Sequence, residues 1–249
     1  MRVVVAGSDA GRLTPLVREI GFELDDAAPE VVISYGGDGT LLGAERDWPG
    51  VPKLAIRHAS TCRKCSDHED AVVLQRLARS ELSRDVLIKV AAEAKGRRLL
   101  GLNEVCLDKA IPTSAVRYRV WIDDVPYSNE IVGDGLIVAT PFGSSAYYRS
   151  ITRSIFRLGI GVAFNNSTEQ VDHLVLRDDE RLRIVITRGP AVLCADNAPD
   201  PVRLSEGNEV EVGKAEESAV LLGIDTLLCN TCRRADGLPF NRLGGLRCL

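Results

Sequence analysis

The sequence predicts an α/β N-terminal domain, a parallel sheet with helices against it, followed by a β-rich C-terminal domain. Residues 1–60 alternate short apolar runs with segments of helical periodicity, the order that builds a parallel sheet. After about residue 85, β-like runs follow one another with turns and little helix. The chain has 249 residues, which allows one large or two small domains.

The first part begins with a β-branched strand at residues 2–6, and a helix follows at 12–20 with apolar residues at helical spacing. The continuous apolar run at 31–35 is typical of a strand buried on both faces. A third strand is expected at 53–57 and a second amphipathic helix at 67–80.

The second part is a series of short strands. Asp123-Asp124 follows one of them and is expected to form a hairpin turn. The expected strands are residues 86–90, 98–107, 116–122, 136–140, 161–165, 182–187, 191–195, 209–212 and 219–224.

Charge and hydropathy narrow the function classes. Lys plus Arg number 31 and Asp plus Glu 35, a net charge of −4, which argues against a nucleic-acid groove. No apolar run approaches the ~20 residues of a membrane helix, and residues 1–7 are too short for a signal-peptide core. We therefore expect a cytoplasmic protein with reduced thiols, and with neither nucleic acid nor membrane as a partner.

The strongest local motif is Gly36-Gly37-Asp38-Gly39-Thr40, at the end of the buried strand. Glycines permit close backbone approach, and consecutive N–H groups before a helix suit phosphate oxygens. A carboxylate in such a cradle repels phosphate, so Asp38 is expected to have a task, such as accepting a proton from an attacking hydroxyl. The alternative is a tight turn in which Asp38 caps the helix.

Two further motifs carry polar groups. In residues 133–148 an apolar strand runs into a Pro/Gly/Ser turn and a short helix, for which Ser144 or Ser145 is the alternative N-cap. Asn103-Glu104 is a polar pair inside an apolar strand and needs partners, unless that strand is an edge facing water.

Together these motifs closely resemble the NAD kinase family. The matching stretches are GGDGT at 36–40, Asn103-Glu104, and the Asp-Gly-Leu-Ile-Val-x-Thr-Pro-x-Gly-Ser-x-Ala-Tyr run at 134–147. GGDGT alone also occurs in lipid kinases and phosphofructokinases, whereas the longer run is more specific. The resemblance implies a dinucleotide in a cleft between the two domains. We expect these domains at 1–96 and 97–224, with 225–249 packing back on the first.

The resemblance also implies the reaction, in which NAD and a phosphoryl donor, ATP or polyphosphate, give NADP. Asp38 would take the proton from the adenosine ribose 2′-hydroxyl, and Mg²⁺ would bridge the donor phosphates. The resemblance further implies a homo-oligomer. The remaining roles would be phosphate binding by Gly36, Gly37, Gly39 and Thr40, and NAD binding by Asn103, Glu104, Asp134, Ser145, Ala146, Tyr147 and Ser150.

Other interpretations stay open. Glu104 and Asp134 are alternatively plain strand-end charges. The protein is alternatively a lipid or small-alcohol kinase of the GGDGT superfamily, or a dinucleotide-binding zinc or redox sensor without turnover. The sensor gains support from residues 55–65, which depart from the family's usual loop. Asp196-Asn197 replaces a usual Asp-Gly turn, with Asn197 expected to tolerate the left-handed conformation.

The cysteines include two Cys-x-x-Cys pairs, at Cys62 and Cys65 and at Cys229 and Cys232. Four thiolates make a tetrahedral zinc set, and the family's returning C-terminal segment would bring the pairs together. The alternatives are reduced thiols or a redox dithiol. The remaining strand cysteines, at positions 106 and 194, lie in apolar runs and are expected to be inert core residues.

Overall fold

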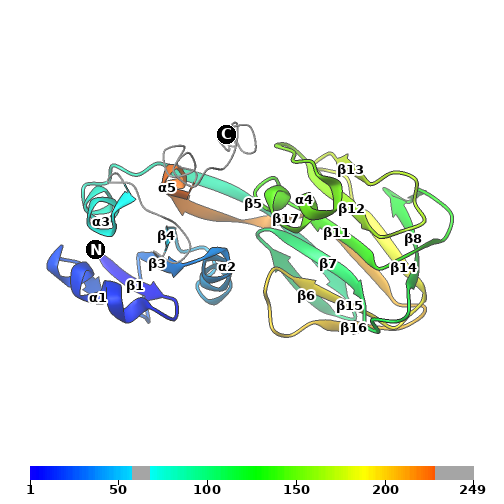
Figure 1. Ribbon diagram of the computed structural model, residues 1–249, viewed down its shortest axis with the longest axis horizontal. Helices are drawn as coiled ribbons and strands as arrows, with labels where there is room; N and C mark the ends of the chain where they lie inside the picture. The colour runs from blue at the N-terminus through cyan, green and yellow to red at the C-terminus, as the bar shows by residue number, and fades with distance from the viewer. Residues whose placement is uncertain (58–67, 228–249) are drawn as a thin grey trace. The chain divides into compact units, whose positions relative to one another are not determined.

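The computed structural model describes residues 1–57 and 68–227, and the chain divides into two compact units. Unit 1 is Met1–Leu87 with the described residues from Ala219 onward, and unit 2 is Ile88–Ser218. The chain passes between the units within two long strands, β5 (Arg84–Ala94) and β17 (Glu209–Leu222) (Figure 1).

Unit 1 is built on a parallel sheet in the order β4-β3-β1-β2, with the last residues of β17 beside β4. Val31, Ile33 and Tyr35 of β3 share a core with α1 and α3, while Val32 and Ser34, which point to the opposite face, are buried as well. Both faces of the sheet are therefore covered. The elements are β1 (Arg2–Ala6), α1 (Ala10–Glu19), β2 (Glu23–Leu24), β3 (Val31–Gly36), α2 (Asp38–Asp47), β4 (Lys53–Arg57), α3 (Asp70–Ala78) and α5 (Ile224–Leu227).

Unit 2 contains two antiparallel sheets. One has the order β10-β8-β14-β17, with β9 on β8 and the β5–β6 hairpin on β17, and the other has the order β13-β12-β11-β7-β15-β16. The strands are β6 (Arg97–Gly101), β7 (Glu104–Lys109), β8 (Val116–Ile122), β9 (Val125–Pro126), β10 (Ile131–Gly133), β11 (Gly135–Ala139), β12 (Ile160–Asn165), β13 (His173–Leu176), β14 (Leu182–Arg188), β15 (Ala191–Ala195) and β16 (Val202–Leu204).

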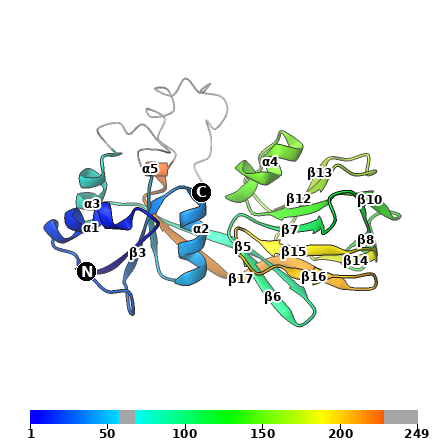
Figure 2. The same ribbon diagram turned by 60° about the horizontal axis from the view of Figure 1, so that its bottom comes forward.

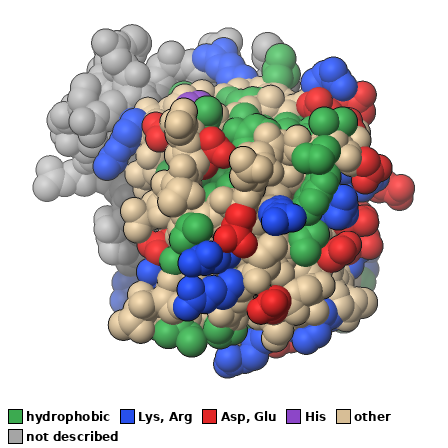
Figure 3. Space-filling model, turned by 90° about the vertical axis from the view of Figure 1, so that its right-hand side faces the viewer, with side chains coloured by type: hydrophobic (Ala, Val, Ile, Leu, Met, Phe, Trp, Pro, Cys, Tyr) green, Lys and Arg blue, Asp and Glu red, His purple; other side chains and the backbone are tan. Residues whose placement is uncertain are grey.

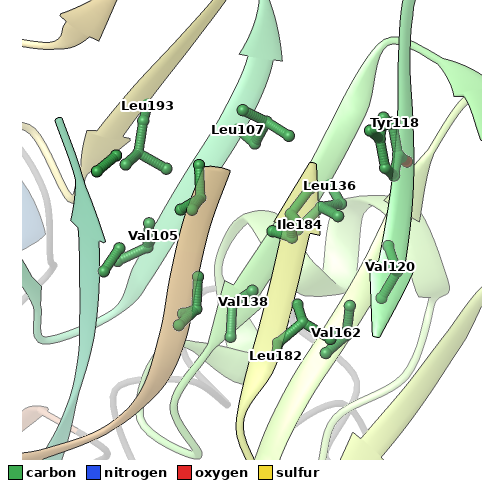
Figure 4. Close-up of a cluster of buried hydrophobic side chains, with 14 of the residues drawn as sticks. Val105, Leu107, Tyr118, Val120, Leu136, Val138, Val162, Leu182, Ile184 and Leu193 are labelled. Carbon is green, nitrogen blue, oxygen red and sulfur yellow. The ribbon is translucent and has the colours of Figure 1, made fainter. Parts of the chain in front are cut away.

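The core of unit 2 lies between these sheets, because alternate residues of each strand point inward. Val105 and Leu107 of β7, Val120 of β8 and Ile184 of β14 all belong to this layer (Figure 4). The outer face of the six-stranded sheet is partly covered by α4 (Tyr147–Thr152), which packs on β11 and β12 on the side away from β14 and β17 (Figure 2). The second sheet therefore has one apolar inner face and one mixed outer face.

The α/β and β-rich fold class is confirmed, and the Asp123-Asp124 turn is confirmed by positive φ angles of 47° and 64° between β8 and β9. Two strand boundaries were wrong. The strand expected at 98–107 is broken after Gly101, and the runs at 209–212 and 219–224 are one continuous strand, β17.

None of the helices among the described residues is long and apolar enough to cross a membrane. On the face drawn in Figure 3, acidic and basic side chains are interspersed among apolar and polar ones over the described part of the chain, the pattern of a solvated surface.

Candidate functional site

The Gly-rich loop connects β3 to α2 in unit 1 and is held closed by contacts to Thr40. A Cβ atom on Gly36 would overlap the Thr40 hydroxyl. Gly7, at the end of β1 with φ +130°, has no room for a Cβ beside the Tyr35 carbonyl oxygen and lies against the Thr40 methyl group. Glycine at both strand ends therefore lets β1 and β3 approach Thr40, a requirement of packing independent of any ligand.

Asp38 is the first residue of α2, and its side chain is 75% exposed. The helix is preceded by Gly37, and no side chain caps it, so the interpretation of Asp38 as a cap was wrong. The carboxylate instead accepts a hydrogen bond from Arg57 Nη2 to Oδ1 at 3.2 Å. An exposed acid at the start of a helix, beside backbone N–H groups, is placed to meet a ligand from solvent.

Arg57 is a residue that the sequence reasoning missed. It ends β4, and the parallel register places it directly beside Gly36 of β3. Its Nε atom is buried and has no hydrogen-bond partner among the described residues. The guanidinium thus places a positive charge beside the Gly-rich loop, where it is able to attract a phosphate group. The available signal was a charged residue ending an apolar strand next to the strand that carries the motif.

In unit 2 the backbone around Asn103 and Glu104 is fixed by Asp196. The Asp196 carboxylate accepts hydrogen bonds from the N–H groups of Leu102, Asn103 and Glu104 at 2.7, 2.8 and 3.1 Å. Asp196 itself adopts the left-handed conformation, with φ 48°, so the expectation that Asn197 does so was wrong. The carboxylate breaks the expected 98–107 strand because it takes N–H groups that would otherwise bond a neighbouring strand.

Thr140 fixes the same segment from the other side. Its N–H donates to the Asn103 carbonyl at 2.8 Å, and its hydroxyl donates to the Leu102 carbonyl at 2.6 Å. The hydroxyl also accepts the Gly143 N–H at 3.0 Å, and a Cβ on Gly143 would overlap the Asn103 backbone. The Asn-Glu motif and the Thr-Pro-x-Gly motif are thus one hydrogen-bonded structure, although they lie far apart in the sequence.

Glu104 is on the outer face of the six-stranded sheet, and the pKa of its carboxyl group is strongly shifted. Burial, reinforced by the nearby Asp196 and Cys194, raises its pKa to about 8. Its Oε2 atom is buried with no hydrogen-bond partner among the described residues. A carboxyl group that keeps its proton at pH 7 is able to donate a hydrogen bond to a ligand. Because β7 lies between β11 and β15, the edge-strand interpretation was wrong.

Asp134 lies between β10 and β11, and both of its carboxylate oxygens have partners. Lys109 Nζ lies 2.6 Å from Oδ1, and Asn166 Nδ2 donates to Oδ2 at 3.3 Å. The Lys109 hydrogen bond is the main reason that the pKa of Asp134 is lowered. The following Gly135, with φ +150°, leaves no space for a Cβ beside the Leu107 carbonyl. Asp134 is therefore an oriented, ionised group.

The Pro/Gly/Ser turn before α4 contains one buried serine and one exposed serine. Ser144 is fully buried, and its hydroxyl lies 2.7 Å from the Pro141 carbonyl and 3.1 Å from the Phe156 carbonyl. Ser145 and Ala146 are exposed. Ala146 immediately precedes α4 without any side-chain cap, so neither serine is the N-cap that the alternative required.

The helix α4 presents the last two predicted residues. Ser150 is exposed, and its hydroxyl donates to the Tyr147 carbonyl one turn back at 2.7 Å. The Tyr147 hydroxyl accepts a hydrogen bond from Asn165 Nδ2 at 3.2 Å, and burial raises the pKa of this tyrosine. Tyr147 is therefore oriented by β12, whereas the Ser150 hydroxyl is occupied by its own helix.

The expectation that the strand cysteines are core residues was wrong. Cys106 and Cys194 are half-buried free thiols, and neither belongs to the core between the sheets. Cys106 packs instead beside Ile137, Ala139 and Tyr148 on the outer face, which also carries Tyr147. The residues predicted as NAD contacts and the two thiols thus lie on one side of the six-stranded sheet or at its ends.

The predicted zinc ligands Cys62, Cys65, Cys229 and Cys232 lie outside the described residues. Within residues 1–57 and 68–227 there is no group of three or more His, Cys, Asp or Glu side chains that could hold a metal ion.

A Gly-rich strand-to-helix loop with an exposed acid, and a β-rich unit with a preorganised polar face, are features typical of proteins that bind phosphates and nucleotides. Comparison with known proteins specifies the class. Residues 102–223 match the model of the ATP-NAD kinase C-terminal domain. This match, with the relatives described next, confirms the resemblance to the NAD kinase family.

The relatives by sequence include NAD kinases of bacteria and archaea. The NAD kinase of Latilactobacillus sakei is 34% identical over 170 residues, 61% of this chain and 62% of that protein. The NAD kinase of Pyrococcus abyssi is 31% identical over 133 residues, 51% of this chain and 48% of that protein. The matched part of the chain thus spans about half to three-fifths of these relatives' length.

Solved structures share the fold more completely. An NAD kinase from Archaeoglobus fulgidus in complex with ATP has a TM-score of 0.74 at 19% identity, covering 95% of this chain and 98% of that one. Yeast NADH kinase complexed with NADH has a TM-score of 0.70 at 19% identity, covering 84% and 71%. These likenesses establish the same fold.

Proposed function

We propose that this protein is an NAD kinase, which transfers the terminal phosphoryl group of ATP or polyphosphate to the adenosine ribose 2′-hydroxyl of NAD. The observation that carries the proposal is the exposed Asp38 carboxylate at the Gly-rich loop, next to Arg57. A protein that only binds a dinucleotide gains nothing from an acid facing phosphates. Its similarity to NAD kinases supports the same choice and counts against a lipid or small-alcohol kinase.

In this proposal the residues of unit 1 handle the phosphoryl donor and the proton. Gly36, Gly37, Gly39 and Thr40 line the phosphate path with backbone N–H groups and a hydroxyl. Asp38 takes the proton of the 2′-hydroxyl as its oxygen attacks the terminal phosphorus, and the bond to the donor's leaving phosphate breaks. Arg57 offsets the charge of the transferring group.

Mg²⁺ would be carried by the donor phosphates, where it supplies charge neutralisation. Mg²⁺ is a hard cation that prefers oxygen ligands, and the exposed Asp38 carboxylate of this loop is such a ligand.

The residues of unit 2 hold the dinucleotide. Asn103 and Glu104 are fixed by Asp196 and Thr140 before any ligand arrives, so little ordering entropy is lost on binding. Protonated Glu104 donates a hydrogen bond and Asp134 accepts one. The other contacts assigned to NAD are Ser145, Ala146, Tyr147 and Ser150.

The direct test is incubation of the purified protein with NAD⁺ and Mg²⁺, with ATP and polyphosphate as donors in separate reactions, followed by detection of NADP⁺. Formation of NADP⁺ with either donor supports the proposal, and comparison of the two rates identifies the donor. Absence of NADP⁺ with both donors, in protein shown to bind NAD⁺, would favour the non-catalytic dinucleotide sensor.

A structural zinc ion held by Cys62, Cys65, Cys229 and Cys232 is part of the proposal, on the sequence spacing alone. Metal analysis of protein purified without added zinc is expected to find one zinc per chain. Four freely titrating thiols in metal-free, folded protein would contradict it. Assembly into a homo-oligomer also stays a prediction, which light scattering of the purified protein would test.

A further inference from the structure

Two free thiols face each other across neighbouring strands of unit 2. In the antiparallel register of β7 and β15, Cys106 is the direct partner of Cys194. The Asp196 N–H donates to the Glu104 carbonyl at 2.9 Å, and the Ala110 N–H donates to the Pro190 carbonyl at 3.0 Å. Hydrogen-bonded and non-bonded pairs alternate along an antiparallel ladder, so the cysteines also form a hydrogen-bonded pair.

The expected Cα spacing at this position is compatible with a disulfide. The Cα atoms of such a pair lie about 5.5 Å apart, within the range of about 4.4–6.8 Å that disulfides span. Both side chains project from the same face, and Cys194 Sγ lies 3.7 Å from the Cys106 carbonyl oxygen. A bridge therefore requires side-chain rotation and a small approach of the strands.

The pair is also accessible to small reagents. Both cysteines are only half-buried, and both lie on the outer face of the sheet, outside the core that the two sheets share. The helix α4 packs chiefly on β11 and β12, and Cys106, but not Cys194, packs against the cluster that includes Tyr148 of this helix.

We propose that Cys106 and Cys194 are a dithiol pair that a low-molecular-weight disulfide of the glutathione class oxidises to a cross-strand disulfide on the candidate dinucleotide-binding face.

The two thiols have different parts in this exchange. Cys194 loses its proton to solvent and attacks a sulfur of the small disulfide; a mixed disulfide forms, and the released small thiolate takes up a proton. Cys106 then loses its proton to solvent and attacks the Cys194 sulfur, releasing the second small thiol. Two protein thiols are oxidised by two electrons, and one small disulfide is reduced to two thiols.

The order follows from the environments of the sulfurs. The hydrogen bond from the Cys106 thiol lowers the pKa of Cys194, against the opposing effects of burial and of Asp108 and Asp196. The same hydrogen bond and burial raise the pKa of Cys106. Cys106 also packs against the cluster around Tyr148, of which Cys194 is not part. Geometry and pKa thus both assign the first attack to Cys194 and the resolving role to Cys106.

The pair lies within the region assigned to NAD. Cys106 is two residues from Glu104 on β7, and Cys194 is two residues from Asp196 after β15. If the proposed function holds, bound NAD⁺ covers this face and slows the oxidation. That consequence rests on the proposed function, whereas formation of the disulfide does not.

The test uses the full chain, incubated with oxidised glutathione, blocked with an alkylating agent and digested with trypsin without reduction. Cleavage after Arg98, Lys109, Arg188 and Arg203 places each cysteine in its own peptide, residues 99–109 and 189–203. The expected product is the cross-linked pair of these peptides, which separates on reduction. This mapping keeps the signal apart from the other cysteines of the chain.

Single-cysteine variants test the order. Cys106→Ser, which keeps a hydroxyl donor beside Cys194, is expected to accumulate a glutathione adduct on peptide 189–203, because the resolving thiol is absent. Cys194→Ala is expected to leave peptide 99–109 largely unmodified over the same time. Alkylation of both thiols without any cross-linked peptide, or an adduct that forms equally fast in both variants, would overturn the proposal.

A final arm adds NAD⁺ at about ten times its Kd, which is expected to slow cross-linking about tenfold because only the free protein reacts. An unchanged rate at proven saturation would show that the thiols lie outside the NAD site. It would contradict the shared location while leaving the mapped disulfide in place. Failure of the proposed function is read separately, from the NADP⁺ assay.

Discussion

The Gly-rich loop of unit 1 and the Asn103–Glu104 segment of unit 2 are held in opposite ways. Asp38 is exposed, and among the described residues it forms one ion pair, with Arg57, at 3.2 Å between Oδ1 and Nη2. The Asn103–Glu104 backbone is hydrogen-bonded by the half-buried Asp196 and the fully buried Thr140. The contrast indicates that the group assigned to chemistry costs the fold little, whereas the groups assigned to recognition are part of the fold itself.

Asp196→Asn is expected to have the largest effect on the free energy of unfolding. Asn keeps the size and tolerates the left-handed backbone, but its amide turns a donor toward one of three N–H groups and removes the charge they bind. We expect a loss of about 3 kcal/mol in the free energy of unfolding, measured by urea denaturation. Asp200→Asn, which removes only an exposed ion pair with Arg97, is the matched control and should cost about 1 kcal/mol or less. Equal losses in the two variants would show that Asp196 does not support the fold.

Thr140→Val should have the next largest effect. Valine fills the same space but leaves the Leu102 carbonyl and the Gly143 N–H without their partner. The expected cost is about 2 kcal/mol of unfolding free energy, with weaker NAD⁺ binding. Thr140→Ser retains the hydroxyl and should recover both hydrogen bonds. If the serine variant were as unstable as the valine variant, the methyl group and not the hydroxyl would be the stabilising part.

The affinity for NAD⁺ should depend on pH through the protonation of the Glu104 carboxyl group. Its carboxyl group holds a proton below a pKa of about 8 and loses it above, and the anion no longer donates a hydrogen bond. Affinity for NAD⁺ should therefore fall as pH rises through about 8, by up to about tenfold per pH unit, which is ~1.4 kcal/mol. In Glu104→Gln, which donates at every pH, calorimetric titration should find this fall removed. A fall of the same size in the glutamine variant would assign the titration to another group.

Ser150→Ala should have the smallest effect. The Ser150 hydroxyl already donates to the Tyr147 carbonyl within α4, so little is left to offer a ligand. We expect NAD⁺ affinity to change by less than about threefold, corresponding to less than ~1 kcal/mol. A loss of tenfold or more would show that this hydroxyl turns to the dinucleotide when it binds.

The sequence predicted those features that depend on local pattern. The βα order, the Gly-rich loop after a buried strand and the Asp123-Asp124 turn each follow from residues that are close together in the chain. The continuous strand β17 was seen as two, because the polar segment through Lys214, Glu216 and Glu217 interrupts its apolar alternation.

What the sequence could not supply depends on register between distant strands. Arg57 meets Asp38 only because β4 lies beside β3, and Asp196 meets Asn103 only because β15 lies beside β7. The cysteines were misjudged for the same reason. An apolar run shows that a strand is covered, but only the alternation of Val105 and Leu107 into the core puts Cys106 on the other face.

The central claim is that chemistry resides in the Asp38 carboxylate and recognition in unit 2. Its most direct test is the single-turnover rate of NADP⁺ formation by Asp38→Asn, with NAD⁺ and donor at saturation and the Kd for NAD⁺ measured in parallel. Asp47→Asn, at the far end of α2, is the control. We expect the Asp38 variant to lose about 10²–10⁴-fold in rate with an unchanged Kd, and the control to retain its rate. A rate within a few-fold of the unmodified protein would contradict the claim.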